Sequence, residues 1–400
     1  MKAGFPKGIR RMPAGSAAVK LFLGAFLAVS LLVPLGAMLL NMAGTDIAAV
    51  VRSPQFREAL GHSINSAGAA TLISITLAYL FALAVLRSKM RFRGVFAVLG
   101  TAPMLIPSIS HGMGLVILLG SNGILTRLFG FTRSIYGFNG IIAGSVLYAF
   151  PVAFLMLADI LAYEDGSPYE AAEVLGIPRT SQFFSITFPY LRKPLISVVF
   201  AVFTLIFTDY GVPLMIGGRY TTLPVLMYQE VIGLLNFSRG SVIGSFLLVP
   251  ALAAFLFDLA ARDRGNQSFV TQKKAGAGSP PGDWAAALYC TVVCAVIILP
   301  LVMFAVLSFV SKYPQDMSFS AVNIARTVNM GAGRYLANSL IMAAGVSLLG
   351  TALSYFTAYF TARTPGKSSS FLHLISITSL AVPGLVLGIS YVLFFNGSFI

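Results

Sequence analysis

The sequence is poor in charged residues: Asp, Glu, Lys and Arg make up 10% of its 400 residues, whereas 57% are hydrophobic. About a quarter of the residues of a typical water-soluble domain are charged, so this chain cannot cover an aqueous surface of normal size. Mean hydropathy is +0.86. These values exclude soluble domains, coiled coils and disordered tails, and they indicate that most of the outside faces lipid.

Cysteine and histidine are also scarce, with two and three residues respectively. Two cysteines cannot build the disulfide framework of a small secreted protein. Cys290 and Cys294 share a helix face within an apolar run and have no metal-binding spacing. His62, His111 and His373 are far apart in the sequence. We therefore predict no metal site and no cofactor.

Nine apolar runs are long enough to cross a bilayer, for which a helix needs roughly 20 residues. The first is longer than the apolar region of a secretory signal, so we interpret it as a retained helix. The sequence thus predicts an all-α polytopic membrane protein that contacts the lipid bilayer directly. The runs are 21–43, 63–86, 95–120, 139–162, 195–217, 241–261, 284–310, 337–362 and 370–395.

Basic residues are distributed unevenly between the connecting segments. Lys and Arg number 27 against 13 Asp and Glu, which gives a net charge of +14. If the N-terminus is cytoplasmic, the inner segments hold twice as many Lys and Arg residues as the outer ones, in line with the positive-inside rule. We therefore predict a multi-pass protein of the bacterial inner membrane with a cytoplasmic N-terminus, and no nucleic-acid partner.

The sequence repeats itself with a period of 276 residues. This shift aligns Arg87 with Arg363 and Pro107 with Pro383 in one ungapped register. One period contains six runs, so both copies enter the membrane in the same orientation. Such a parallel repeat differs from the inverted repeats of many secondary transporters.

The repeat predicts two halves of unequal length. The first, residues 1–261, holds six membrane helices. Residues 262–283 are polar and rich in Gly and Pro, as in a flexible cytoplasmic linker. The second half, 284–400, holds three helices and lacks counterparts of the fourth to sixth runs, so we expect a truncated chain or a fragment of a longer product.

The longest inner segment of the first half, 163–194, has the pattern of two short helices. Ser167-Pro168 is typical of a helix start, with Ser as the N-cap, and Gly176 can supply the left-handed residue that ends the helix. A second helix would begin near Pro178 and stop at Pro189. The side chains suited to a groove on another protein are small or apolar, namely Ala171, Ala172, Val174 and Leu175.

A motif of about 20 residues in this segment resembles the EAA loop of the permeases of type I, binding-protein-dependent ABC importers. The segment also follows the fourth run, where that family carries the loop. The family usually has Leu where this sequence has Phe188. The matching residues are Glu170-Ala171-Ala172, Gly176, Ile186 and Phe188-Pro189.

The resemblance implies a role for each matching residue. The triplet Glu170-Ala171-Ala172 would lie on a coupling helix docked into a dimer of ATP-binding subunits. Gly176 would set the bend, and Ile186 and Pro189 would pack the second short helix under the bundle. ATP hydrolysis would then belong to the separate subunit, and this chain would be a transport subunit and not an enzyme. An extracytoplasmic solute-binding protein would dock on outer loops such as 218–240.

The whole chain is similar to the members of this family that are fused in tandem, whose solutes are ferric iron, thiamine or 2-aminoethylphosphonate. The stretch 208–213 resembles the fifth-helix ending of the iron and phosphonate members, so Asp209 and Tyr210 are candidates for the solute path. An ionisable group within a membrane run is a functional hypothesis by default. A structural hydrogen-bonding role for Asp209 fits its position equally well.

Two other classes of protein compete with an ABC importer permease. A secondary transporter would work without an ATPase, but the parallel repeat and the EAA-like loop argue against it. A membrane-embedded enzyme would need clustered polar groups within the runs, and the sequence shows no such cluster. We therefore expect a permease that imports ferric iron or a phosphonate.

Overall fold

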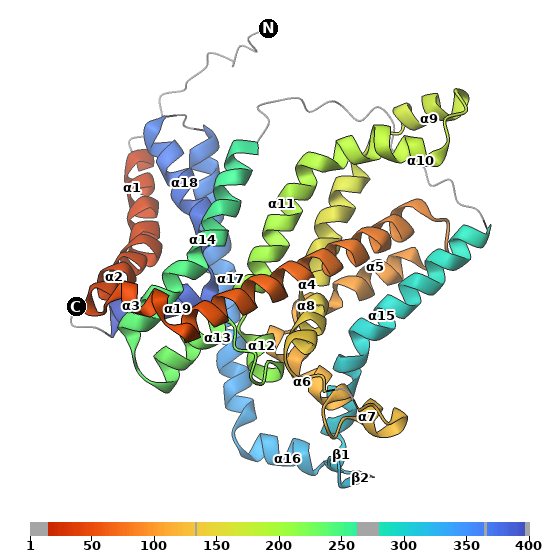
Figure 1. Cartoon of the computed structure of the whole chain (residues 1–400). Coiled ribbons are helices and arrows are strands. Elements are labelled where there is room, and N and C mark those ends of the chain that lie inside the picture. Colours follow the sequence, from red (N-terminus) through yellow and green to blue (C-terminus); the bar gives the residue numbers. More distant parts are fainter. Residues whose placement is uncertain (1–14, 133, 262–279, 364–365, 397–400) are drawn as a thin grey trace. The chain divides into compact units, whose positions relative to one another are not determined.

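The computed structural model describes residues 15–132, 134–261, 280–363 and 366–396 (Figure 1). The described chain divides into two compact units, one of residues 42–323 and one of residues 1–41 with 324–400. Most of the predicted linker and the first 14 residues, with four of their basic side chains, lie outside the described residues. We describe each unit by itself.

The unit of residues 42–323 contains most of the helices and one short hairpin of two antiparallel strands. Two of its elements, η4 and η5, are single wide helical turns of the π type, and η2 and η3 are 3-10 turns. In chain order the elements are η2 (Met42–Gly44), α3 (Ile47–Arg52), α4 (Pro54–Arg87), α5 (Arg93–Thr101), η3 (Ala102–Leu105), α6 (Ser108–Leu119), α7 (Ile124–Phe129), α8 (Phe138–Ala162), α9 (Ser167–Val174), α10 (Arg179–Gln182), η4 (Phe183–Thr187), α11 (Phe188–Phe207), α12 (Gly211–Ile216), α13 (Leu223–Tyr228), η5 (Gln229–Gly233), α14 (Phe237–Ala261), α15 (Pro280–Ser308), β1 (Val310–Lys312) and β2 (Asp316–Phe319).

The second unit is built from both ends of the chain. Its N-terminal part is one apolar helix with a π-type turn in its middle, and its C-terminal part is a long helix followed by two shorter ones. Helix α16 (Val322–Asn329) begins at the boundary between the units. The other elements are α1 (Gly15–Leu27), η1 (Ala28–Leu32), α2 (Val33–Asn41), α17 (Ala332–Arg363), α18 (Lys367–Ala381) and α19 (Gly384–Phe395).

The predicted class, an all-α polytopic membrane protein, is confirmed. Seven helices among the described residues are long and apolar enough to cross a bilayer, and three shorter apolar helices accompany them. The third and ninth predicted runs are not single helices, because both break just before a proline, at Pro107 and Pro383. Proline lacks the N–H that would continue a helix and disfavours helical backbone before it. The same break at both repeat positions supports the register of the repeat.

Helix α4 forms the centre of the larger unit and packs along α8 and α11. Its buried face consists mostly of small side chains, which let membrane helices approach closely. Phe81 fills the remaining space and meets Phe150 and Phe154 of α8 edge to face, with ring centroids 5.4 and 4.9 Å apart. The opposite face of α4 is apolar and exposed, with Leu72 70% accessible, as expected for contact with lipid.

The compact units do not coincide with the two halves that the repeat predicts. Helix α15 opens the second half in sequence but packs on α4, α5 and α6, where Tyr289 donates a hydrogen bond to the Leu77 carbonyl at 2.8 Å. In the other unit, α1 and α2 pack on helices of the second half, and Tyr391 donates to the Ser30 carbonyl at 2.8 Å. Each unit thus combines the first helix of one half with the following helices of the other.

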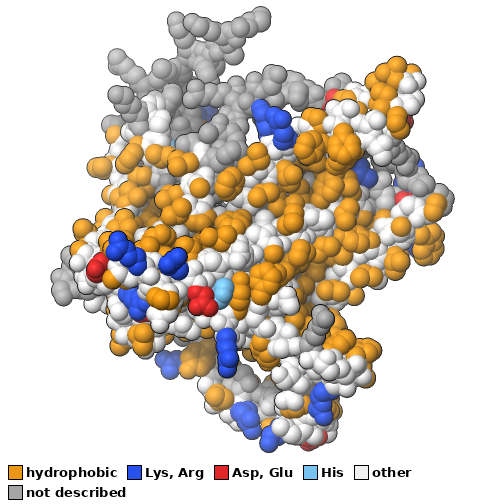
Figure 2. Space-filling view, viewed as in Figure 1, with side chains coloured by type: hydrophobic (Ala, Val, Ile, Leu, Met, Phe, Trp, Pro, Cys, Tyr) orange, Lys and Arg blue, Asp and Glu red, His pale blue; other side chains and the backbone are white. Residues whose placement is uncertain are grey.

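The surface of the larger unit matches a chain that lies in lipid. On the face shown in Figure 2, hydrophobic side chains cover much of α4 and α15, and charged side chains gather toward the ends of the helices. Exposed apolar residues on α15 include Leu288 and Val296, at 68% and 57% accessibility. Monomeric soluble proteins rarely expose apolar areas of this extent.

Candidate functional site

The EAA-like segment folds into the short helix α9, which projects beyond the ends of the long helices (Figure 1). The helix starts at Ser167, so Ser167 is its first residue and not the N-cap, which is Gly166. The start is held instead by Asp165, whose carboxylate accepts hydrogen bonds from the Ser167 N–H at 3.1 Å and the Ser167 hydroxyl at 2.9 Å. Pro168 falls in the first turn, where its missing N–H costs nothing.

The end of α9 follows the prediction at Gly176. This residue has φ +66°, in the left-handed region that glycine adopts without steric cost. The Gly176 N–H donates to the Glu173 carbonyl at 3.0 Å and the Ile177 N–H to the Ala172 carbonyl at 2.9 Å. These two bonds form a Schellman motif, so the chain turns at a defined angle after α9.

The two faces of α9 differ sharply. Glu170 and Ala171 are exposed, and Val174 and Leu175 are 88% and 75% accessible. Ala172 is buried within the chain at 3% accessibility, so it lies on the inner face and not on the face that the sequence suggested. The outward face therefore offers a carboxylate beside two large apolar side chains.

The second short helix does not stop at Pro189, and that part of the prediction was wrong. Helix α10 passes through the π-type turn η4 directly into α11, and Pro189 is the second residue of α11. In η4 the Phe188 N–H bonds back to the Phe183 carbonyl. The wider turn makes room for the pyrrolidine ring and absorbs the missing N–H. Ile186 is half-buried in this turn and Pro189 is exposed.

A buried polar cluster holds α9 against the long helices. Arg87, the last residue of α4, donates to the Glu164 carboxylate at 2.6 Å and to the Leu161 carbonyl at 3.0 Å. Tyr169 donates to the other oxygen of Glu164. The Thr187 hydroxyl lies 2.5 Å from the Tyr169 oxygen and donates to it, since the tyrosine proton is already used. We call Arg87, Glu164, Tyr169 and Thr187 the loop cluster.

The loop cluster is almost closed to solvent. The side chain of Arg87 is 17% accessible and that of Glu164 is 3% accessible. Burial and the hydrogen bond to Glu164 raise the pKa of Tyr169, so its hydroxyl remains a donor at neutral pH. Removing one partner of a buried ion pair costs about 3–5 kcal/mol, because the other charge is left unpaired. The cluster therefore fixes α9 to α4, α8 and the start of α11.

Sequence analysis did not assign the loop cluster. Arg87 was noted as a residue shared by the two copies of the repeat, and Tyr169 directly precedes the EAA triplet. The missed clue was the placement of Glu164 and Tyr169 five residues apart across a short turn. Their contact depends on where α9 starts, and the sequence predicted Ser167 as the N-cap whereas the N-cap is Gly166.

The candidate solute-path residues lie where the fifth predicted run breaks. Asp209 stands between α11 and α12, and its two carboxylate oxygens accept hydrogen bonds from the Gly211 N–H at 3.2 Å and the Val212 N–H at 3.0 Å. Ser108 also bonds to its side chain. Tyr210 is half-buried and stacks on Tyr228, with centroids 5.5 Å apart. Asp209 thus caps α12 and ties it to α6.

Helix α12 packs unusually close to α6 and α8, at positions occupied by glycine. A Cβ on Gly144 would lie 2.5 Å from Cγ1 of Val212, and one on Gly112 would lie 2.8 Å from Cβ of Met215. A side chain at either position would force neighbouring atoms to shift. The break at 208–210 and the two glycines therefore place α12 inside the bundle.

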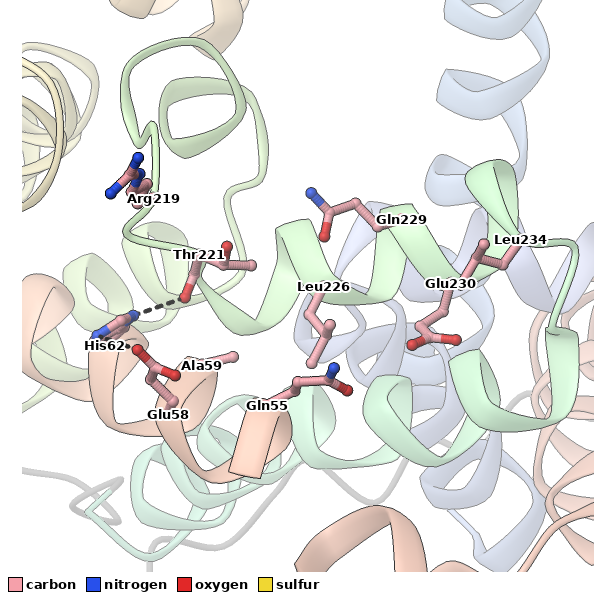
Figure 3. Close-up of a pocket in the computed structure, with 10 residues that line it drawn as sticks. All are labelled: Gln55, Glu58, Ala59, His62, Arg219, Thr221, Leu226, Gln229, Glu230 and Leu234. Atoms are coloured by element: carbon pink, nitrogen blue, oxygen red, sulfur yellow. Dashed lines mark hydrogen bonds and ion pairs between the residues drawn. The ribbon is translucent and has the colours of Figure 1, made fainter. Parts of the chain in front are cut away.

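A polar pocket of about 300 Å³ opens at the far end of α4 (Figure 3). The Nδ1 atom of His62 lies 3.0 Å from the Thr221 carbonyl oxygen. The His62 ring stacks on the Tyr220 ring, with centroids 3.6 Å apart. On the other side Glu230, 4% accessible, pairs with Arg239 at 3.0 Å. The lining residues are Gln55, Glu58, Ala59, His62, Arg219, Thr221, Leu226, Gln229, Glu230 and Leu234.

The histidines and cysteines show no metal centre. Within the described ranges there is no group of three or more His, Cys, Asp or Glu side chains that could hold a metal ion. Cys290 and Cys294 are both buried and unbridged in α15. The described residues do form a protruding helix, an interrupted membrane helix and a polar pocket at the N-terminal end of α4.

These features define a multi-pass membrane domain. Residues 74–262 match the model of the family described as binding-protein-dependent transport system inner membrane component. Over that range, which is a little less than half of the chain, the sequence is similar to this family. The matched range contains both α9 and α12.

Two relatives named as ferric transport permeases align along most of the chain. It is 26% identical over 407 residues to the ferric transport system permease protein FbpB of Actinobacillus pleuropneumoniae, covering 94% of this chain and 59% of that protein. It is 27% identical over 354 residues to the putative ferric transport system permease protein FbpB 1 of Haemophilus influenzae, covering 84% and 56%. The chain thus spans less than two thirds of the length of these relatives.

A solved structure shares the fold. A chain of a bacterial alginate ABC transporter, in complex with an alginate pentasaccharide-bound periplasmic protein, superposes with a TM-score of 0.51 at 15% identity. The superposition covers 61% of this chain and 91% of that one. At this identity the similarity concerns the fold alone.

Proposed function

We propose that this chain is the membrane permease of an ATP-driven importer, and that it forms the solute path and couples it to a separate ATP-binding subunit. The observation that carries the proposal is the outward face of α9, where Glu170 and Ala171 are exposed beside Val174 and Leu175. Large apolar side chains exposed on a protrusion outside the lipid-facing helices are typical of protein interaction surfaces. The EAA resemblance supports a dimer of ATP-binding subunits as the partner.

The solute we propose is ferric iron. The support is that the relatives aligned over 94% and 84% of the chain are named as ferric transport permeases. Thiamine and a phosphonate such as 2-aminoethylphosphonate, which the resemblance in the sequence also admits, are the solutes to compare in a transport assay. In this account Asp209 and Tyr210 shape the solute path by holding α12 in place.

An extracytoplasmic solute-binding protein is the second proposed partner. It would dock on the outer loops around 218–240, where the polar pocket opens between α4 and η5. The pocket and α9 lie toward opposite ends of the larger unit, since His62 and Arg87 are near opposite ends of α4. The excess of Lys and Arg on the proposed inner segments supports a cytoplasmic N-terminus. With this orientation α9 would lie in the cytoplasm and the pocket outside.

The organisation into two halves, 1–261 and 284–400 joined by 262–283, is part of the same proposal. The ungapped register and the recurring break before Pro107 and Pro383 support it.

Co-purification of the ATP-binding subunit tests this function. Glu170→Arg reverses the charge on the exposed face of α9 and should abolish capture of the subunit, as should deletion of 168–189. Glu58→Arg makes the same charge reversal near the N-terminal end of α4, far from α9, and should leave capture of the subunit unchanged. If Glu170→Arg retains the subunit at the wild-type level, the assignment of α9 as the coupling helix is wrong.

A further inference from the structure

The loop cluster connects α9 to the C-terminal end of α4. Arg87 closes α4, and its guanidinium reaches Glu164 at 2.6 Å while Tyr169 of α9 donates to the same carboxylate. The Glu164 carboxylate thus links the Tyr169 hydroxyl of α9 to Arg87, the last residue of α4. Any displacement of α9 must either move the end of α4 or break a buried, charge-assisted hydrogen bond.

Helix α4 is suited to pass such a displacement along its length. It runs unbroken for 34 residues, with its only proline at the first turn. The other long helices of the same unit, α8, α11, α14 and α15, each contain an internal proline. Sharp kinks in helices occur mainly at proline, so α4 is the stiffest long helix of this unit.

The far end of α4 holds the loop that borders the outer pocket. Ser63 accepts a hydrogen bond from the Leu223 N–H at 2.7 Å, and His62 is hydrogen-bonded to the Thr221 carbonyl at 3.0 Å. From His62 to Arg87 the helix spans roughly 38 Å at a rise of 1.5 Å per residue. One rigid helix therefore has the coupling helix attached at one end and the 217–223 loop at the other.

We propose that Arg87 and Tyr169 are positioning residues that join the coupling helix to α4, and that α4 carries the movement of α9 to the loop bordering the outer pocket. The inference rests on the proposed function, because it assigns a route between the ATP-binding subunit and the outer face. The proposal also states that different residues of α9 bind the subunit and transmit its movement. Glu170 faces the subunit, whereas Tyr169 faces the bundle.

Tyr169→Phe tests the proposal, because it removes one hydroxyl and keeps the ring. The assay uses the chain in proteoliposomes with its ATP-binding subunit and a solute-binding protein loaded with ferric iron. We expect the subunit to stay bound and basal ATP hydrolysis to stay unchanged. Stimulation of hydrolysis by the loaded binding protein should fall about tenfold, the size expected for loss of a hydrogen bond to a charged group.

A matched control and a second pair of variants keep the test decisive. Tyr163→Phe makes the same change at an exposed tyrosine of the same loop and should alter nothing. Arg87→Met should lose the stimulation and Arg87→Lys should recover part of it, since Lys keeps the charge opposite Glu164. A merely structural role would instead lower binding of the subunit in parallel with stimulation.

Two results would overturn the proposal. One is full stimulation in both Tyr169→Phe and Arg87→Met. The other is loss of the ATP-binding subunit from Tyr169→Phe to the same extent as from Glu170→Arg, which would show that Tyr169 only supports docking. Failure of the proposed function itself is recognised separately, by retention of the subunit in Glu170→Arg.

Discussion

Tyr169 and Glu170 are neighbours in α9, and the Tyr169 side chain is buried against the bundle whereas Glu170 is exposed. The Tyr169 side chain is 6% accessible and hydrogen-bonded to Glu164 and Thr187. A helix of eight residues thus presents one face to the bundle and leaves the other exposed. Variants on the two faces should therefore have different effects, and variants that change the angle of α9 should weaken docking.

Gly176→Ala should weaken binding of the ATP-binding subunit by roughly 5–30-fold, because a left-handed alanine costs about 1–2 kcal/mol. Gly176→Asn should be milder, since Asn tolerates this conformation better. Gly94→Ala on α5, where an added Cβ meets nothing within 4 Å, is the control. Affinity measured by surface plasmon resonance decides. Equal affinities for Gly176→Ala and Gly94→Ala would show that the Schellman turn does not set the docking angle.

Gly144→Ala should destabilise the bundle, because its Cβ would lie 2.5 Å from Cγ1 of Val212. Overpacking of this kind typically costs about 1–3 kcal/mol. Gly68→Ala on α4, with open space around the added Cβ, should be neutral or slightly stabilising. Thermal unfolding in detergent measures the difference, and Val212→Ala should restore the midpoint of Gly144→Ala. No rescue would mean that α12 does not pack on α8 as described.

Asp209→Ala should impair ferric iron uptake more than Asp209→Asn does. The carboxylate of Asp209 accepts two backbone hydrogen bonds that cap α12. Asn keeps one acceptor oxygen and Ala keeps none, and loss of a cap costs about 0.5–2 kcal/mol. Uptake assays with matched protein levels separate the two roles of Asp209. Complete loss of uptake in Asp209→Asn with unchanged stability would show that the negative charge acts on the solute directly.

Ser63→Ala should lower the stimulation of ATP hydrolysis by the loaded solute-binding protein, because it removes the acceptor of the Leu223 N–H. The ATP-binding subunit should stay bound, since α9 is far from this position. Thr76→Ala on the same helix removes a hydroxyl that bonds only within α4, to the Leu72 carbonyl, and should have no effect. A wild-type response in Ser63→Ala would mean that the 217–223 loop is not part of the route.

The membrane class and the Gly176 turn could be predicted from the sequence because each depends on composition or on one residue. Apolar runs report burial in lipid whatever their packing, and only glycine enters the left-handed region freely. Proline causes the breaks before Pro107 and Pro383. The sequence nevertheless predicted single helices there, because both prolines lie within long apolar runs.

The continuation through Pro189 and the loop cluster could not be predicted in this way. The π-type turn at Phe183–Thr187 depends on how the helix packs. Arg87 and Glu164 are 77 residues apart in the sequence, and no local pattern brings them together. The packing of α15 on α4, α5 and α6 could not be predicted either. The apolar surface of α15 does not indicate which helices it contacts.

Dependence of uptake on ATP tests the central claim most directly. Proteoliposomes that contain this chain, its ATP-binding subunit and a loaded solute-binding protein should take up ferric iron only with ATP in the compartment that faces α9. Uptake should stop when the subunit is omitted or when Glu170→Arg replaces the wild type. Uptake that persists without any nucleotide hydrolase, driven by an ion gradient, would contradict the account and indicate a secondary transporter.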